Sequence, residues 1–212
     1  MRSGSDGFLL ATRSTDKLAE IRAIFPVPLR AALLSLDDLG LQPAALEDEL
    51  EVHETFAENA VAKAEFFRRE TGLPTIADDS GLVVPALGGR PGVRSKRFAG
   101  RADLGGQALD DANNAALLAA LRDVPKEERS AYYVCAAVLV GTGAPIIAFG
   151  TTAGLILDAP IGNNGFGYDP LFFHPDIGRT FGEIASSAKH TLSHRGRAFR
   201  ALSVVVGGNR VL

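Results

Sequence analysis

The order of strand-like and helix-like runs constrains the fold of this chain more than any other feature. Apolar runs alternate with amphipathic helical periodicity in the first half, whereas consecutive apolar strands dominate the second half. The predicted elements are a strand at Phe8–Ala11, helices over Leu18–Phe25, from Thr55 and over Asp110–Leu121, and strands at Tyr132–Val140, Ile146–Gly150 and Thr152–Leu157. This order predicts an α/β fold in which helices flank a mixed sheet.

Composition narrows the class of protein. The 212 residues allow one buried core, or a core with an appended lobe, so we expect a single domain over residues 1–212. A formal net charge of -3 argues against nucleic acid as the main partner. No apolar run approaches the roughly 20 residues that span a bilayer, and Met1–Gly7 lacks the apolar centre of a signal peptide. The single cysteine, Cys135, fits a reducing compartment, so we expect a cytoplasmic protein.

Two adjacent carboxylates follow the apolar run Leu73–Ile76, which predicts that Asp78 and Asp79 lie at the end of a buried strand. Burying two carboxylates is costly unless a cation neutralises them, and oxygen ligands suit Mg²⁺. Neighbouring strand residues face opposite ways, so we expect only one of the pair to reach a metal. The alternative is a polar turn in which both side chains cap the backbone.

Two other segments are candidates for phosphate binding. Thr12–Lys17 joins the first strand to a helix, whose free N–H groups and positive end attract anions, and Arg13 and Lys17 add positive charge. The segment has no glycine and is not a P-loop, so a plain helix N-cap is the alternative. Lys63 lies beside the apolar face of the helix that begins near Thr55, where it either reaches over a cleft or is a surface lysine.

The glycine-rich segment Gly162–Phe173 is a candidate for binding a flat ligand. Glycines on either side of an aromatic residue let the backbone approach a ring closely, so Phe166 or Tyr168 could stack on a base. Asp169 could then hydrogen-bond to the same base. The alternative is a glycine-rich turn whose aromatic side chains join the core.

A second anion site is predicted in the polar segment Ser187–Arg197. Ser193 is a natural N-cap for the last helix. Lys189, His194 and Arg195 would then gather near the start of that helix, where positive charge and free N–H groups favour an anion.

Five motifs, in chain order, resemble those of one protein family. They are Thr55-Phe56-x-Glu58-Asn59-Ala60-x-x-Lys63-Ala64, Ala77-Asp78-Asp79-Ser80-Gly81-Leu82, Ala86-Leu87-Gly88-Gly89-x-Pro91-Gly92, Gly165-Phe166-Gly167-Tyr168-Asp169-Pro170 and Ser193-His194-Arg195-Gly196. From about Phe8 to Leu202 the chain resembles the noncanonical purine nucleoside triphosphate pyrophosphatases, the inosine triphosphatase or Ham1-like family. The resemblance implies an elongated α/β fold with a long central mixed sheet and two lobes around a cleft.

The same resemblance implies an activity. Members of this family are Mg²⁺-dependent homodimers that hydrolyse dITP, ITP and XTP to the monophosphate and pyrophosphate, which cleanses the nucleotide pool. The implied substrate is therefore a small-molecule nucleoside triphosphate, with neither nucleic acid nor a membrane as a partner.

Site residues follow from the resemblance motif by motif. Asp79 would be the general base that activates water and also a Mg²⁺ ligand, Glu51 would be a second metal ligand, and Asp78 would support them. The implied substrate-binding residues are Thr12, Arg13, Ser14, Thr15, Asp16, Lys17 and Lys63 for the phosphates, Phe166, Gly167, Tyr168, Asp169, Lys189, His194 and Arg195 for the base, and Ser80 as a further contact.

The chain departs from the family in its phosphate loop. The family motif usually reads Thr/Ser-Gly-Asn-x-x-Lys, whereas this chain has Thr12-Arg13-Ser14-Thr15-Asp16-Lys17. Ser14 has a shorter reach than asparagine and fewer hydrogen-bonding groups. Two alternatives stay open: a related pyrophosphatase that acts on other modified nucleotides, and a non-catalytic nucleotide-binding or RNA-binding protein that uses the basic segment 90–101.

Overall fold

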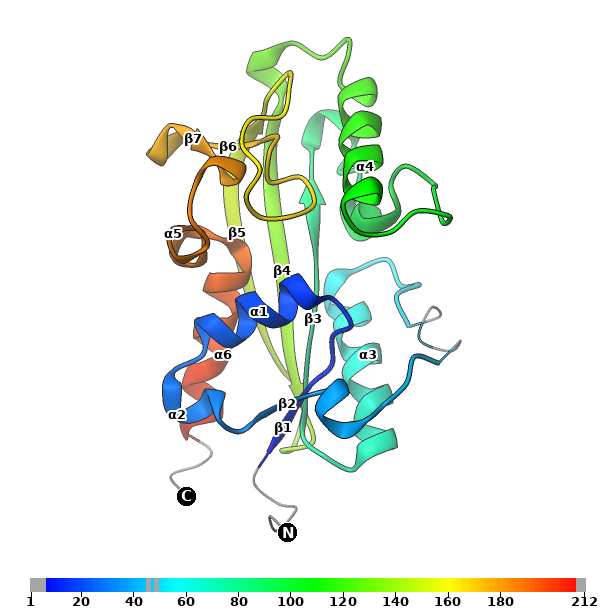
Figure 1. The fold of residues 1–212 in the computed structure, drawn as a ribbon, viewed down its shortest axis with the longest axis vertical. Helices are drawn as coiled ribbons and strands as arrows, with labels where there is room; N and C mark the ends of the chain where they lie inside the picture. The colour runs from blue at the N-terminus through cyan, green and yellow to red at the C-terminus, as the bar shows by residue number, and fades with distance from the viewer. Residues whose placement is uncertain (1–6, 45–46, 48–49, 209–212) are drawn as a thin grey trace. The chain divides into compact units, whose positions relative to one another are not determined.

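The computed structural model describes residues 7–44, 47 and 50–208, in which helices flank a sheet (Figure 1). The strands are β1 (Phe8–Leu10), β2 (Leu33–Ser35), β3 (Thr75–Val83), β4 (Ser130–Val140), β5 (Ile146–Ile156), β6 (Phe172–His174) and β7 (Arg179–Thr180). The α-helices are α1 (Thr15–Ile24), α2 (Val27–Arg30), α3 (Phe56–Thr71), α4 (Gly106–Ala120), α5 (Ser186–Leu192) and α6 (His194–Gly208).

The predicted mixed α/β fold is confirmed. Within the described residues the sheet has seven strands in the order β2-β1-β3-β4-β5-β6-β7. Strand β1 pairs in parallel with both β2 and β3, whereas β6 pairs antiparallel with both β5 and β7. In both parallel pairs, β1 with β2 and β1 with β3, helices lie between the two strands in the sequence, as a crossover connection requires.

The described residues form two compact units. Unit 1 takes its residues from 1–79, 135–150 and 194–212, and unit 2 from 80–134 and 151–193. Strands β3, β4 and β5 therefore each contribute residues to both units.

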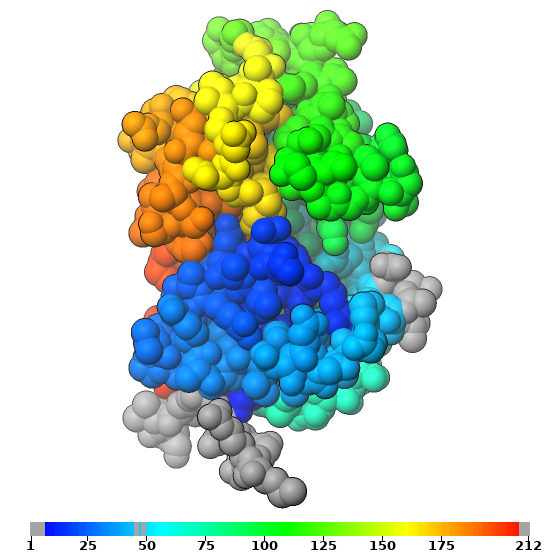
Figure 2. Space-filling model, in the orientation of Figure 1, coloured from blue at the N-terminus to red at the C-terminus, as the bar shows by residue number. Residues whose placement is uncertain are grey.

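Alternation along the strands divides the core of unit 1 into two layers. In β3, Ile76 packs with side chains of α1, α2 and α6, whereas the next residue, Ala77, packs with α3. Cys135 and Ala136 of β4 repeat the pattern. Because successive strand residues face opposite sides, helices cover both faces of this part of the sheet. Figure 1 shows α3 apart from α1, α2 and α6. In Figure 2 the atoms of α1 and α2, in blue, form part of one continuous surface.

Helix α3 begins and ends as its sequence predicts. The Thr55 hydroxyl accepts a hydrogen bond from the Glu58 N–H at 3.2 Å, so Thr55 is the N-cap. Gly72 ends the helix with a φ of +73°, a left-handed conformation that glycine adopts without strain. Asn59 and Lys63, four residues apart, consequently lie on one face of a well-defined helix.

Unit 2 has an aromatic core. The ring of Phe172 lies 4.6 Å from that of Tyr133 and 5.1 Å from that of Phe181, measured between centroids. Leu117 and Leu121, in and just after α4, pack against the same cluster. Buried aromatic rings and leucine side chains thus pack together in the core of this unit.

Several local expectations were wrong. Asp78 and Asp79 lie in the middle of β3, because the strand continues through them to Val83 and is neither ended nor replaced by a turn. The two strands predicted at Ile146–Gly150 and Thr152–Leu157 form one continuous strand, β5, from Ile146 to Ile156. Gly150 does not interrupt this strand; instead, its missing side chain lets α6 pack closely on it. Strand β2 and the short helices α2 and α5 were not foreseen.

Some sequence expectations fall outside the described part of the chain. Residues 1–6, including most of the segment tested for a signal peptide, are among them. Among the helices that the structure describes, none is both long and apolar enough to cross a membrane.

Candidate functional site

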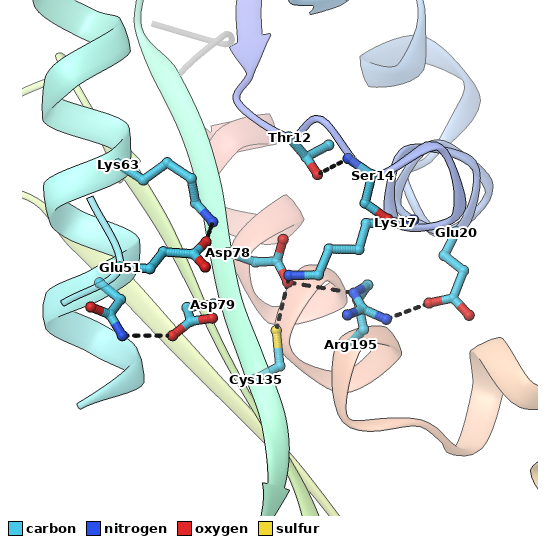
Figure 3. A network of polar contacts seen from close by, with 11 residues as sticks. Thr12, Ser14, Lys17, Glu20, Glu51, Lys63, Asp78, Asp79, Cys135 and Arg195 are labelled. Carbon is cyan, nitrogen blue, oxygen red and sulfur yellow. Dashed lines mark hydrogen bonds and ion pairs between the residues drawn. The ribbon is translucent and has the colours of Figure 1, made fainter. Parts of the chain in front are cut away.

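Asp78 and Asp79 point to opposite faces of β3, as the alternation of strand side chains predicts (Figure 3). Both carboxylates are buried, with exposed fractions of 1% and 5%. Asp78 faces α1 and α6, and Asp79 faces α3. The two carboxylates thus have different partners, and each has to be considered separately.

Asp78 lies among positive charges. Its Oδ2 is 3.2 Å from Nζ of Lys17 and 3.5 Å from Nε of Arg195. Arg195 also donates a hydrogen bond to Glu20, and the Cys135 thiol lies 4.0 Å from Asp78 Oδ2. Burial alone would raise the pKa of Asp78, but Lys17 and Arg195 outweigh burial and hold that pKa well below its usual range. Asp78 is therefore ionised and holds two cationic side chains in place.

Asp79 lies in a less favourable environment. Its Oδ2 accepts a hydrogen bond from Nδ2 of Asn59 at 3.0 Å, and Glu51, which forms an ion pair with Lys63, is close enough to repel it. Burial first, and the Glu51 charge in addition, raise the pKa of Asp79 despite the opposing effect of Lys17 and Lys63. Burial disfavours the charge of Lys63 too, but nearby carboxylates raise its pKa, so it stays protonated.

This arrangement fits a divalent cation. A cation beside Glu51 and Asp79 would remove the repulsion between them and lower the pKa of Asp79. Within the described residues, no group of three or more histidine, cysteine, aspartate or glutamate side chains is placed to hold a metal ion. Two carboxylates suit Mg²⁺, which proteins commonly bind through one or two carboxylates together with substrate phosphates and water.

The predicted phosphate segment connects β1 to α1 in unit 1. Ser14 is the N-cap of α1, and its hydroxyl accepts a hydrogen bond from the Lys17 N–H at 3.2 Å. The hydroxyl of Thr12 accepts a hydrogen bond from the Ser14 N–H at 3.2 Å. Thr15 and Asp16 are exposed in the first helical turn. Ser14 thus has the capping role that was the alternative reading, at a helix end suited to binding an anion.

Arg13 is held within unit 1. Its guanidinium donates two hydrogen bonds to Glu47, at 2.9 and 2.7 Å, and one each to the carbonyl oxygens of Leu41 and Gln42, at 2.6 and 3.0 Å. It also lies 5.9 Å from the centre of the Phe67 ring. These contacts favour a structural role, in which Arg13 connects the phosphate segment to Leu41, Gln42 and Glu47.

The aromatic loop Gly165–Asp169 lies in unit 2 with Lys189. Asp169 Oδ2 accepts a hydrogen bond from the Phe166 N–H at 2.9 Å and forms an ion pair with Lys189. The Lys189 ammonium lies 4.7 Å from the centre of the partly exposed Phe166 ring. Gly165 has a φ of +73°, and a Cβ there would lie 2.0 Å from Asp169 Oδ2, so the loop requires glycine at this position.

The other predicted residues are placed as follows. Tyr168 lies in the unit 2 core, and its hydroxyl donates a hydrogen bond to the Ser95 carbonyl oxygen at 2.8 Å, as the alternative reading of this loop expects. Ser80 is half-buried and follows Asp79 in β3. His194 is buried at the start of α6 in unit 1.

Sequence reasoning missed Asn59, Glu20 and Glu47, which bind Asp79, Arg195 and Arg13 respectively. A signal existed for Asn59, a polar residue one helical turn before Lys63 on a largely apolar helix face. Glu20, beside Ile21 in α1, likewise interrupts a helix that is otherwise partly apolar. Nothing in the local sequence indicates the partner of Glu47, because 34 residues separate it from Arg13.

Comparisons with known proteins agree with this architecture. A model of the Ham1 family matches residues 8–205. A protein of Frankia alni named dITP/XTP pyrophosphatase is 46% identical over 202 residues, which cover 93% of this chain and 96% of that protein. A Geobacter sulfurreducens protein of the same name is 47% identical over 200 residues, which cover 94% and 96%. The solved structure of a HAM1 protein from Coxiella burnetii has a TM-score of 0.81 at 35% identity, and the match covers 95% of this chain and 98% of that one.

Proposed function

The chain belongs to the Ham1 family, and we propose on that basis that it is a Mg²⁺-dependent nucleoside triphosphate pyrophosphatase. Its substrates would be dITP, ITP and XTP, and its products the nucleoside monophosphate and pyrophosphate. The observation that carries this proposal is the placement of Glu51, Lys63 and Asp79 together on the α3 side of β3. A protein that only binds nucleotides has no need of a buried carboxylate beside a second carboxylate and a lysine.

The proposed reaction is attack of water on the α-phosphorus. Asp79 accepts the proton of the attacking water, the new bond joins the water oxygen to the α-phosphorus, and the bond from that phosphorus to the oxygen bridging to the β-phosphorus breaks. Held by Glu51, Asp79 and phosphate oxygens, Mg²⁺ would supply positive charge that stabilises the leaving pyrophosphate. Lys63, Lys17 and the first turn of α1 bind the phosphate oxygens and position them for this step.

The base is assigned to a different group of residues. In unit 2, Phe166 offers a partly exposed ring for stacking, with Lys189 and Asp169 fixed beside it. The candidate donors to the 6-keto oxygen of the purine are Arg195 and the backbone N–H groups of the turn formed by Ser193, His194 and Arg195. An adenine amino group would leave those donors unpaired, and such mismatches discriminate strongly. An Arg195→Ala variant that kept the full preference for ITP over ATP would contradict this role of Arg195.

We propose that a second copy of the chain covers an apolar part of unit 1. Val52, Ile147 and Phe149 are exposed there by 67%, 40% and 60%. Next to Ile147 lies a groove lined by His53, Ala57, Glu58, Val61 and Ala62. Grouped exposed apolar side chains are typical of an interface, and the family resemblance implies a homodimer. Light scattering should give twice the monomer mass for the wild-type protein and the monomer mass for Phe149→Asp. A monomeric wild-type protein would contradict the proposal.

A cytoplasmic location is also part of this proposal. Its support is Cys135, the single cysteine in the sequence, which is buried and free. Fractionation of expressing cells tests it, because recovery of the protein outside the cytoplasmic fraction would contradict the location.

The enzymatic proposal is tested by pyrophosphate release from ITP, XTP, dITP, ATP and GTP, with Mg²⁺ and with a chelator. We expect Mg²⁺-dependent turnover of ITP, XTP and dITP, little turnover of ATP, and loss of activity in Asp79→Asn. Asp111→Asn is the matched control, since Asp111 is exposed and its described partner is Gln107 on the same helix. Absence of turnover of all five nucleotides by the wild-type protein would refute the proposal.

A further inference from the structure

Helix α4 binds one residue of the aromatic loop through both of its backbone groups. Asp110 Oδ2 accepts a hydrogen bond from the Gly167 N–H at 2.7 Å, and Asn114 Nδ2 donates one to the Gly167 carbonyl oxygen at 2.9 Å. Asp110 and Asn114 are four residues apart and therefore lie on the same face of the helix. Both contacts lie within unit 2.

Gly167 is the position where these contacts have most effect on the loop. Its φ of +63° is a left-handed conformation that glycine adopts at little cost. On one side, the Phe166 ring stays partly exposed next to Lys189; on the other, the Tyr168 ring is buried in the core. Fixing the backbone of Gly167 therefore determines which of the two aromatic rings remains available to a ligand.

The neighbouring asparagine has a different task. Asn113 accepts a hydrogen bond from the Ala99 N–H at 2.8 Å and donates one to the Lys96 carbonyl oxygen at 3.0 Å. It is buried to a similar degree as Asn114, with exposed fractions of 3% and 8%. Two adjacent asparagines on α4 thus hold two different segments, and Asn113 does not contact the aromatic loop through these hydrogen bonds.

We propose that Asp110 and Asn114 are positioning residues that hold the aromatic loop in the conformation that recognises the purine base. The proposal rests on the proposed function, because that function assigns the base to Phe166 and its neighbours. Without the two hydrogen bonds, the loop would have to be ordered when the nucleotide binds, and this ordering weakens binding. The groups assigned to the phosphates and the metal belong to unit 1, so the loss should appear in KM and base selectivity and leave kcat nearly unchanged.

The test compares Asn114→Asp with Asn113→Asp. Each substitution preserves shape but replaces a donating amide with a carboxylate that cannot donate to a carbonyl oxygen. We expect Asn114→Asp to raise the KM for ITP about tenfold, with a matching loss of affinity for IMP by calorimetry and a smaller preference for ITP over ATP. Asn113→Asp should lower Tm but leave these constants unchanged. Asp110→Asn, whose amide oxygen still accepts from Gly167, should behave like the wild-type protein, whereas Asp110→Ala should resemble Asn114→Asp.

The outcomes separate this inference from the proposed function. An Asn114→Asp protein with unchanged KM and IMP affinity overturns the inference, as does an Asn113→Asp protein with the same kinetic defect. If Asn114→Asp does not fold, the pair Asp110→Ala and Asp110→Asn gives the same comparison. A wild-type protein that releases no pyrophosphate refutes the proposed function instead. In that case the inference is judged by binding alone, and equal affinity for IMP in the wild-type and Asn114→Asp proteins overturns it as well.

Discussion

At the scale of single residues, Asp78 and Asp79 show how one strand provides two separate environments. Positive charges surround Asp78 and lower its pKa, whereas burial and Glu51 raise the pKa of Asp79. The charge of Asp78 compensates buried cations and so contributes to folding. The charge of Asp79 opposes folding in the absence of a cation, which agrees with its proposed role as the general base.

The two asparagine variants should therefore differ. Asp78→Asn leaves the charges of Lys17 and Arg195 without their shared carboxylate, so we expect the free energy of unfolding to fall by about 3 kcal/mol. Asp79→Asn should change it by less than about 1 kcal/mol and reduce pyrophosphate release at least a hundredfold. Urea unfolding and the pyrophosphate assay measure the two effects. Equal destabilisation by both variants would show that the two carboxylates do not have the separate roles assigned here.

The ion pair of Arg13 and Glu47 predicts a pH effect. The hydrogen bond from Arg13 is the main reason that the pKa of Glu47 lies below its ordinary value of 4.5. Since the pKa is lower in the folded state, the pair should stabilise the protein above that ordinary value and lose its effect as pH falls through the folded-state pKa. A double-mutant cycle with Arg13→Met and Glu47→Gln should give a coupling of about 1 kcal/mol at neutral pH, and the coupling should decrease as the pH falls below the ordinary pKa of 4.5. A coupling independent of pH would contradict this.

At the scale of elements, local chemistry predicted some boundaries well and others poorly. The Thr55 cap and the Gly72 stop define α3, and their effects act within a few residues. Asp78 and Asp79 were instead predicted to end their strand, because two carboxylates look unfavourable inside one. Lys17 and Arg195 supply the compensating charge, and they come from helices 61 and 117 residues away along the chain (78 minus 17, and 195 minus 78). Sequence periodicity carries no information about such distant partners.

The contact between β5 and α6 provides a test at this scale. A Cβ at Gly150 would lie 2.1 Å from the His194 carbonyl oxygen and 2.6 Å from the Ala198 nitrogen, both backbone atoms. Gly150→Ala must therefore displace α6, and we expect a loss of about 3 kcal/mol in urea unfolding. Gly207→Ala, in α6 itself, is the control. A Cβ at Gly207 would lie 3.8 Å from the nearest atom, Leu29 Cδ1, and alanine has a higher helix propensity than glycine. A Gly150→Ala protein as stable as Gly207→Ala would show that α6 packs less closely than described.

At the scale of the whole molecule, the order of elements sufficed to predict the α/β class and the mixed sheet. The two compact units were not derivable from local sequence, because strands β3, β4 and β5 contribute residues to both. The proposed site residues Asp79, Glu51 and Lys63 came from the family resemblance, and the structure adds Asn59 as a hydrogen-bond partner of Asp79. The role of Arg13 could not be decided from the sequence, since its contacts are with Leu41, Gln42 and Glu47, which follow α1, α2 and β2 in the chain.

Removal of metal should separate activity from stability of the whole protein. Without a cation, Glu51 still has Lys63 and Asp79 still has Asn59, so the described polar groups around the site keep partners. We therefore expect a chelator to abolish pyrophosphate release but to shift Tm by less than about 2 °C, which corresponds to at most about 1 kcal/mol for a chain of this size. Adding Mg²⁺ together with IMP should raise Tm, because both would bind only the folded protein. A large fall in Tm on chelation alone would instead mean that the cation is part of the fold.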